Sequence, residues 1–140
     1  MSRVVKCAHI QASNAKHDGT PAEIKEAMIE KHIPLIEEAG KKGVNILCLQ
    51  EIFYGPYFCA EQDIKWYQTA EPVPGPTTER LAEYAKKYRM VMVIPVYEME
   101  IEGVYFNTAA VVDADGTYLG KFRKIHIPVS YTHLRAHETF

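Results

Sequence analysis

The chain has 140 residues, of which 47% are hydrophobic and 24% are charged, which is ordinary for a folded globular domain and argues against disorder. Sixteen Lys and Arg residues against eighteen Asp and Glu residues give a net charge of −2. This balance provides no basic surface for nucleic acid or an anionic membrane. We therefore expect a small-molecule partner.

Targeting signals and cysteine pairs are not evident in the sequence. The N-terminal residues run directly into a strand-like stretch, and no segment approaches the roughly 20 apolar residues needed to span a bilayer. The three cysteines, Cys7, Cys48 and Cys59, lack the spacing of a disulfide framework or a zinc ribbon. We expect a cytoplasmic protein with reduced thiols.

The first predicted elements are a strand, a helix and a second strand. Residues 4–10 suit a buried strand, and the Thr-Pro-Ala-Glu segment at 20–23 is a capping box that predicts a helix start. Apolar residues on one face predict that this helix covers a sheet, with a kink at Pro34. Residues 44–49 are apolar on both faces, which predicts a strand covered on both sides.

The second half of the chain predicts another helix and three more strands. A loop rich in aromatic residues, Gly and Pro occupies 53–76, and an amphipathic pattern at 81–88 predicts a helix. A strand at 91–97 precedes a hairpin of 105–112 and 117–122, joined by an Asp-Ala-Asp-Gly turn. This order predicts an α/β layered domain with helices packed on a sheet.

Glu51 is the first candidate for chemistry. It follows the strand at 44–49, in the position where α/β proteins bind ligands. Aromatic residues, including Tyr54, come directly after it, and they would raise the basicity of the carboxylate by excluding water. A solvated glutamate beside ordinary core aromatic residues is the alternative interpretation, and position alone does not decide between the two.

Lys124 is the second candidate. It lies in a basic segment, 120–128, that leaves the predicted hairpin. Taken alone, such a segment is typical of an exposed strand edge that discourages aggregation. Glu98, at the end of the third strand, and Asn107 are further candidates for a pocket.

Five segments together indicate a family. They are Leu-Cys-Leu-Gln-Glu at 47–51, Gly-Pro-Thr-Thr at 75–78, Tyr-Phe-Asn-Thr-Ala at 105–109, Asp-Ala-Asp-Gly at 113–116 and Arg-Lys-Ile-His-Ile-Pro at 123–128. In this order they resemble the first two signature regions of the nitrilase superfamily of carbon-nitrogen hydrolases. The residues of these segments are most similar to those of the N-carbamoyl amidohydrolase branch, which includes β-ureidopropionases and N-carbamoylputrescine amidases.

The resemblance implies a fold and a reaction. It implies that residues 1–128 are a partial carbon-nitrogen hydrolase domain, the N-terminal half of an α-β-β-α layered sandwich. Glu51 aligns with the general base and Lys124 with the lysine of a Glu-Lys-Cys triad. In this chemistry a thiolate attacks the substrate carbon, and the lysine stabilises the developing oxyanion, which is worth roughly 3 kcal/mol. No metal or organic cofactor is required.

Weaker candidates for substrate binding come from their positions along the chain. Tyr54, Glu98 and Asn107 are candidates for substrate binding. His126 lies inside the matching region beside Lys124, and we expect it mainly to hydrogen-bond the loop that positions the lysine. A contribution of His126 to substrate binding stays open.

The nucleophile of the family lies in a later Cys-Tyr-Asp-like segment, and the sequence has no such segment. Cys48 has the pattern of a buried small hydrophobic residue, and the neighbours of Cys59 give no electropositive setting for a thiolate. We therefore expect the 140-residue chain to be inactive. We also expect it to be poorly soluble by itself, and we expect the longer parent enzyme to be a homo-oligomer.

Residues 129–140 depart from the family pattern, and we expect them to be a non-native tail. His133 and His137 within this stretch would share one face of a helix, with Glu138 adjacent, and suggest a metal site, but we favour the tail interpretation.

Two alternatives for function remain open. The first keeps the superfamily and changes the substrate to an aliphatic amide, a nitrile or an acyl group passed to an amine. The second is a non-catalytic module that binds a small carboxylated or amide ligand, or a partner chain, through the strand before Lys124.

Overall fold

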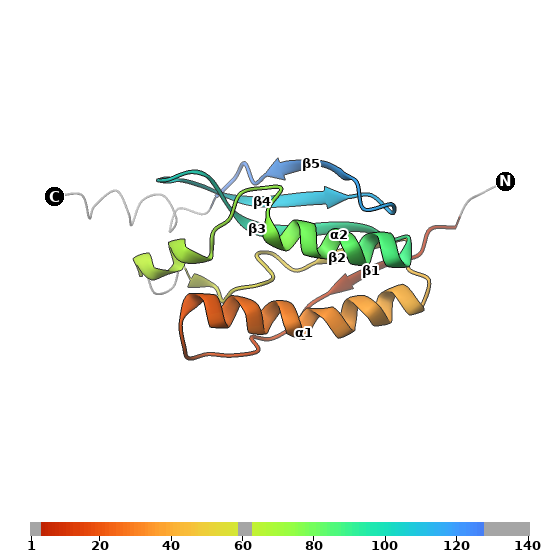
Figure 1. Cartoon of the computed structure of the whole chain (residues 1–140), viewed down its shortest axis with the longest axis horizontal. Helices are drawn as coiled ribbons and strands as arrows, with labels where there is room; N and C mark the ends of the chain where they lie inside the picture. Colours follow the sequence, from red (N-terminus) through yellow and green to blue (C-terminus); the bar gives the residue numbers. More distant parts are fainter. Residues whose placement is uncertain (1–3, 59–62, 128–140) are drawn as a thin grey trace.

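The computed structural model describes residues 4–58 and 63–127 as one five-stranded sheet with helices (Figure 1). The elements are β1 (Cys7–Ile10), α1 (Pro21–Lys41), β2 (Ile46–Leu49), η2 (Ile64–Thr69), α2 (Pro76–Tyr88), β3 (Val91–Ile101), β4 (Val104–Val112) and β5 (Tyr118–Arg123). The predicted α/β class is confirmed. The predictions for Cys59 and for residues 129–140, with His133, His137 and Glu138, lie outside the described residues.

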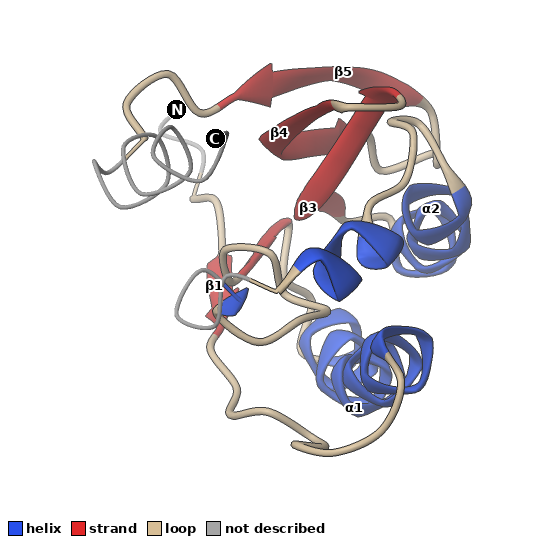
Figure 2. Ribbon diagram, turned by 90° about the vertical axis from the view of Figure 1, so that its left-hand side faces the viewer, coloured by secondary structure: helices blue, strands red, loops and turns tan. Residues whose placement is uncertain are grey.

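The strands follow one another across the sheet in chain order, β1-β2-β3-β4-β5. Strands β1, β2 and β3 are parallel, and β4 and β5 continue the sheet as antiparallel hairpins. Right-handed crossovers that step in one direction across a sheet place their helices on the same face. Figure 2 shows α1 and α2 together on one side of the sheet. The opposite side, called the open face below, carries no helix of the described chain.

Side chains alternate between these two faces. Leu47, Ile94 and Ala110 point toward the helices and are fully buried. On the open face Ile46 is 37% exposed and Phe122 is 61% exposed. The prediction that the second strand is covered on both sides is therefore wrong for the described residues, because both helices lie on the same side.

Helix α1 confirms the predicted capping box. The Thr20 hydroxyl accepts a hydrogen bond from the Glu23 backbone N–H, and the Glu23 carboxylate accepts one from the Thr20 backbone N–H. Met28 and Ile36 are fully buried on its inner face. The helix continues without interruption through Pro34 to Lys41.

Several boundaries differ from the sequence predictions. Strand β1 begins at Cys7, β3 extends to Ile101, and the aromatic loop contains the 3₁₀ helix η2. The extension of β3 arises because β4 pairs with it along nearly its whole length, from Met92 to Ile101. Within the described residues, no helix combines the length and the apolar character that crossing a bilayer requires.

Candidate active site

Glu51 and Lys124 form one ion pair at the end of the parallel strands. Lys124 Nζ lies 2.7 Å from Glu51 Oε1, and Asn107 Nδ2 donates to the same oxygen at 2.6 Å. The lysine and glutamate are 73 residues apart in sequence. The predicted convergence of these two side chains is confirmed.

Two short segments hold this pair. Glu51 lies in a turn after β2, anchored where the Phe53 backbone N–H donates to the Pro95 carbonyl at 3.3 Å. Ile52 in this turn has a positive φ of 44°, a conformation that is uncommon for a β-branched residue. Lys124 follows β5, and its backbone N–H donates to the Asn107 carbonyl at 2.8 Å. Asn107 thus fixes the lysine through its backbone and the glutamate through its side chain.

The charges of the pair influence each other. The hydrogen bond from Lys124 lowers the pKa of Glu51; partial burial opposes this shift, and Asn107 adds to it. The glutamate side chain is 58% exposed. The expectation that the surroundings raise the basicity of Glu51 is wrong in its net direction, because the hydrogen bond from Lys124 outweighs the effect of partial burial on the pKa. Phe53 and Tyr54 are themselves buried in the core. At neutral pH Glu51 is therefore an ionised carboxylate and can accept a proton.

A hollow of about 540 Å³ lies on the open face beside this pair. Glu51, Asn107, Lys124 and His126 line it at one end, and Cys48 lies among the apolar side chains of its wall. The Cys48 thiol donates to its neighbour's carbonyl at 3.4 Å, and burial raises its pKa. The raised pKa favours an unreactive thiol, although Cys48 is half-buried and not the fully buried residue that the sequence predicted.

A second cavity of about 590 Å³ shares Asn107 and Lys124 with the hollow and extends along the β3–β4 hairpin. The rings of Tyr67 and Tyr105 stack at 4.6 Å, and Tyr105 stacks on Tyr97 at 5.5 Å. We call this space the aromatic cavity. Its lining is Ile52, Phe58, Tyr67, Tyr97, Glu102, Gly103, Tyr105, Phe106, Asn107, Lys124 and Ile127.

Glu98 lies away from both cavities. It points to the helix side of the sheet, is fully buried, and binds Lys121 Nζ at 2.5 Å, Arg123 Nη2 at 2.6 Å and the Thr108 hydroxyl at 2.6 Å. Burial alone would raise the pKa of Glu98, but these hydrogen bonds outweigh it and lower the pKa to about 2. The substrate-binding prediction for Glu98 is thus not supported by its placement, because the carboxylate is committed to this buried ion cluster.

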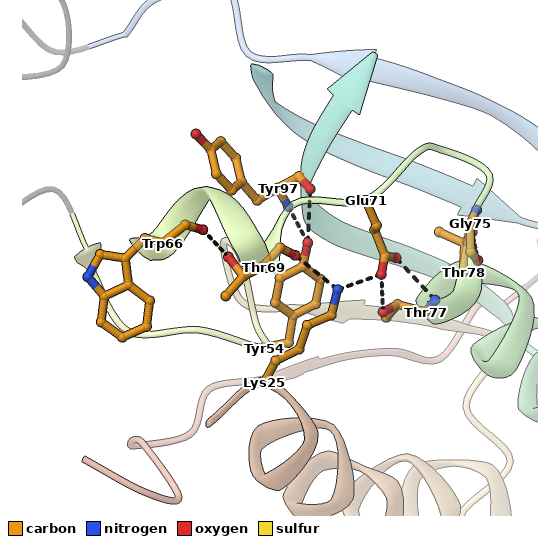
Figure 3. Close-up of polar contacts among 9 residues, drawn as sticks. All are labelled: Lys25, Tyr54, Trp66, Thr69, Glu71, Gly75, Thr77, Thr78 and Tyr97. Carbon is orange, nitrogen blue, oxygen red and sulfur yellow. Dashed lines mark hydrogen bonds and ion pairs between the residues drawn. The ribbon is translucent and has the colours of Figure 1, made fainter. Parts of the chain in front are cut away.

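Tyr54 also lies outside the two cavities, in a buried network shown in Figure 3. Its hydroxyl donates to the Tyr97 carbonyl at 3.0 Å and accepts from the Tyr97 N–H at 2.8 Å. Lys25 Nζ lies 4.3 Å from the Tyr54 ring centroid and 2.6 Å from Glu71 Oε2. Glu71 in turn accepts hydrogen bonds from the Thr77 backbone N–H and hydroxyl at the start of α2.

This network ties helix α1, the turn after Glu51 and the start of α2 to strand β3. The structure therefore places Tyr54 as a support of the turn rather than at a cavity wall. The sequence analysis missed Lys25 and Glu71, because they are 46 residues apart and no local pattern pairs them. Among the described residues, no group of three or more His, Cys, Asp or Glu side chains is placed to hold a metal ion.

The comparisons with known proteins agree on one family. The carbon-nitrogen hydrolase family profile matches residues 6–140, a range that includes the predicted tail. A β-ureidopropionase from Arabidopsis thaliana is 42% identical over 129 residues, which are 90% of this chain and 32% of that protein. An N-carbamoylputrescine amidase from Oryza sativa subsp. japonica is 45% identical over 95 residues, which are 67% of this chain and 31% of that protein.

A solved structure gives the same result. The crystal structure of a carbon-nitrogen hydrolase from Helicobacter pylori matches with a TM-score of 0.76 at 26% identity, and covers 91% of this chain and 42% of that one. The chain spans about a third of the length of the curated relatives above. The profile match and the shared fold confirm the predicted resemblance: the chain belongs to the carbon-nitrogen hydrolase family.

Proposed function

We propose that this chain supplies the carboxylate and the lysine of an amidohydrolase that cleaves a non-peptide carbon-nitrogen bond in a linear N-carbamoyl amine or amide. The observation that carries the proposal is the 2.7 Å contact between Glu51 and Lys124 at the rim of two cavities. The names of the relatives, a β-ureidopropionase and an N-carbamoylputrescine amidase, support the N-carbamoyl class.

The two side chains have complementary tasks in this reaction. Glu51 takes the proton of an attacking thiol, and the resulting thiolate adds to the carbonyl carbon of the substrate. The Lys124 ammonium stabilises the negative charge that forms on the former carbonyl oxygen. Glu51 then returns the proton to the leaving nitrogen, and ammonia departs as the tetrahedral intermediate collapses to a thioester.

Water completes the reaction through the same groups. Glu51 removes a proton from the attacking water, the carbon-sulfur bond breaks, and the proton passes from Glu51 to the released thiolate. The acid departs as the second product. For an N-carbamoyl substrate this acid is a carbamic acid, which breaks down to an amine and carbon dioxide.

We place the nucleophile outside this chain, in the remainder of a longer protein, because neither described cysteine is suited to the role. Cys7 lies on β1, at the opposite edge of the sheet from β5, and Cys48 is a half-buried thiol whose pKa is raised by burial. The open-face hollow beside Glu51 and Lys124 is the place where a thiol from a covering segment would enter. By this proposal the 140-residue chain binds substrate weakly and does not turn it over.

Binding of a neutral probe to the purified chain tests the proposal. We expect N-butylurea to shift backbone NMR signals near Glu51, Asn107 and Lys124, and we expect no release of ammonia. Lys124→Met should abolish the shifts, because it removes the charge that meets the carbonyl oxygen. Lys86→Met, on the exposed side of α2, is the matched control and should leave them unchanged.

Two results would overturn parts of the proposal. Shifts that are absent, or that persist in Lys124→Met, would remove the site. Ammonia released by the purified chain and lost in Glu51→Gln would show that the nucleophile lies within this chain.

An aliphatic amidase is the second candidate function. An omega-amidase from Xenopus tropicalis is 37% identical over 105 residues, so the family resemblance at this level also fits a simple amide. Tighter binding of butyramide than of N-butylurea would favour this candidate.

A further inference from the structure

The aromatic cavity carries an uneven distribution of charge. Of its described lining residues, Lys124 and Glu102 are the charged ones, and Lys124 is already paired with Glu51 at 2.7 Å. Asn107 also directs its side-chain N–H to Glu51. The positive charge of this cavity, on Lys124, is thus paired with Glu51. We call the part of the cavity beside this pair the reaction end. The Glu102 carboxylate is the remaining charge on the cavity wall.

Glu102 and the reaction end lie at different points along the β3–β4 hairpin. It is in the turn between β3 and β4, next to Gly103, while Asn107 is in the interior of β4. The four residue-to-residue steps from Gly103 to Asn107 span roughly 13 Å of strand at about 3.4 Å per step. A linear substrate of several bonds, held at Lys124 by its carbonyl oxygen, would therefore extend along the hairpin toward Glu102.

The wall between these two ends suits an alkyl chain. Tyr67, Tyr105 and Tyr97 line this wall and stack on one another, so their rings provide much of its surface. Ring edges provide an apolar surface, and phenol oxygens can accept hydrogen bonds. The Glu102 carboxylate on the same wall is an acceptor that an ammonium group can satisfy and that disfavours a carboxylate.

We propose that Glu102 and this tyrosine stack form a subsite for the cationic end of a linear N-carbamoyl amine, and that Glu102 sets the preference for a positive charge. The inference rests on the proposed function, because it takes the ureido group to be held at Glu51 and Lys124. It adds a prediction of the charge at the end of the substrate opposite the ureido group. The substrates that the names of the relatives indicate differ at that end.

Three ureas of similar length test the inference on the 140-residue chain. They are N-carbamoylputrescine, which is cationic, N-pentylurea, which is neutral, and 5-ureidopentanoate, which is anionic. We expect dissociation constants from NMR titration to be about threefold to fivefold lower for the cation than for the neutral urea, the scale of a solvent-screened ion pair. The anion should bind most weakly, and added salt should reduce the differences.

Variants separate the charge effect from other causes. Glu102→Gln should remove the preference for the cation, so that N-carbamoylputrescine and N-pentylurea bind with similar dissociation constants. Glu83→Gln makes the same change of charge at an exposed position on α2 outside the cavity, and it should preserve the preference.

Each remaining outcome contradicts a specific claim. Equal binding of the three ureas, tighter binding of the anion, or a preference that survives Glu102→Gln would overturn the charge-selecting subsite while leaving the ureido site in place. If none of the three ureas binds, and Lys124→Met does not change the spectra in their presence, the subsite and the proposed function are both overturned.

Discussion

Two ion-pair systems on opposite faces of the sheet use similar side chains in different environments. The Glu51 and Lys124 side chains are 58% and 40% exposed, whereas Glu98 is fully buried between Lys121 and Arg123. An exposed pair contributes little to stability, because solvent screens it, while a buried carboxylate that loses its charge leaves its partners unsatisfied. The exposed pair is therefore available for chemistry, and the buried one stabilises the fold.

This contrast predicts different costs for the same substitution. Glu51→Gln should change the free energy of unfolding by less than about 1 kcal/mol, the scale of a surface ion pair. Glu98→Gln should lower it by about 3 kcal/mol, because Lys121 loses its carboxylate and Arg123 retains its pairing with the more exposed Glu100. Urea denaturation followed by circular dichroism measures both values. Equal costs for the two variants would contradict the assigned environments.

Glu98 also makes stability depend on pH. Its pKa is about 2 in the folded chain, against an ordinary value of 4.5. Because the folded value is the lower one, the stabilisation is fully present above about pH 4.5 and is lost as the pH falls toward 2. The full shift corresponds to roughly 3 kcal/mol. Unfolding free energies of the wild-type chain and Glu98→Gln should converge over this range, and a constant difference would contradict the shift.

The sequence could predict some of these residues and not others. The family resemblance indicated Glu51 and Lys124, and the sequence offered Asn107 as a weaker pocket candidate; the structure brings all three together. It did not indicate that Glu98 faces the helices, because the face of β3 on which a residue lies depends on the register with β4. Glu102 carried no signal at all, since an acidic residue in a hairpin turn is ordinary.

At the scale of elements, helices α1 and α2 meet at a glycine. A Cβ atom at Gly40 would lie 2.2 Å from the Tyr88 ring, closer than any real contact. Glycine inside a helix costs about 1 kcal/mol relative to alanine. Its presence in α1 is thus explained by the close approach of the last residue of α2.

Gly40→Ala tests this contact because two effects oppose each other. Helix propensity alone would stabilise the variant, but the clash with Tyr88 should destabilise it by about 1–3 kcal/mol. Thermal unfolding gives the sign directly. Gly55→Ala, at a position where an added Cβ meets nothing within 4 Å, is the control and should be nearly neutral. A higher melting temperature for Gly40→Ala would contradict the close packing.

Local patterns predicted the helices better than the strands. The start of α1 is encoded in four consecutive residues at 20–23, so it could be placed from the sequence. The length of β3 and the 3₁₀ helix η2 depend on contacts with distant segments, such as the hydrogen bond from the Met99 N–H to the Glu71 carbonyl. Contacts of this kind leave no periodic pattern in the sequence.

At the scale of the whole molecule, the described residues cover one face of the sheet and leave the other face open. Phe122 and Ile125 on or beside the open face are 61% and 73% exposed. Contiguous apolar surface of this kind is typical of an interaction surface or a source of aggregation. The resemblance to a longer fold predicted poor solubility. The open face is the surface through which we expect the chain to self-associate.

Substitution on the open face tests whether it causes self-association. Phe122→Ser should reduce concentration-dependent light scattering of the purified chain, because it removes exposed apolar area. Leu119→Ser removes a side chain of similar exposure, 58%, away from the open-face hollow, and it should have a smaller effect. A chain that stays monomeric at all concentrations before any substitution would contradict the assignment.

The pairing of Glu51 with Lys124 is tested most directly by a pH titration of the Glu51 carboxyl carbon by NMR. The wild-type chain should show a pKa below the ordinary glutamate value, and Lys124→Met should raise that pKa, because the lysine hydrogen bond is the main cause of the shift. The same ordinary pKa in both proteins would show that the carboxylate and the ammonium do not meet.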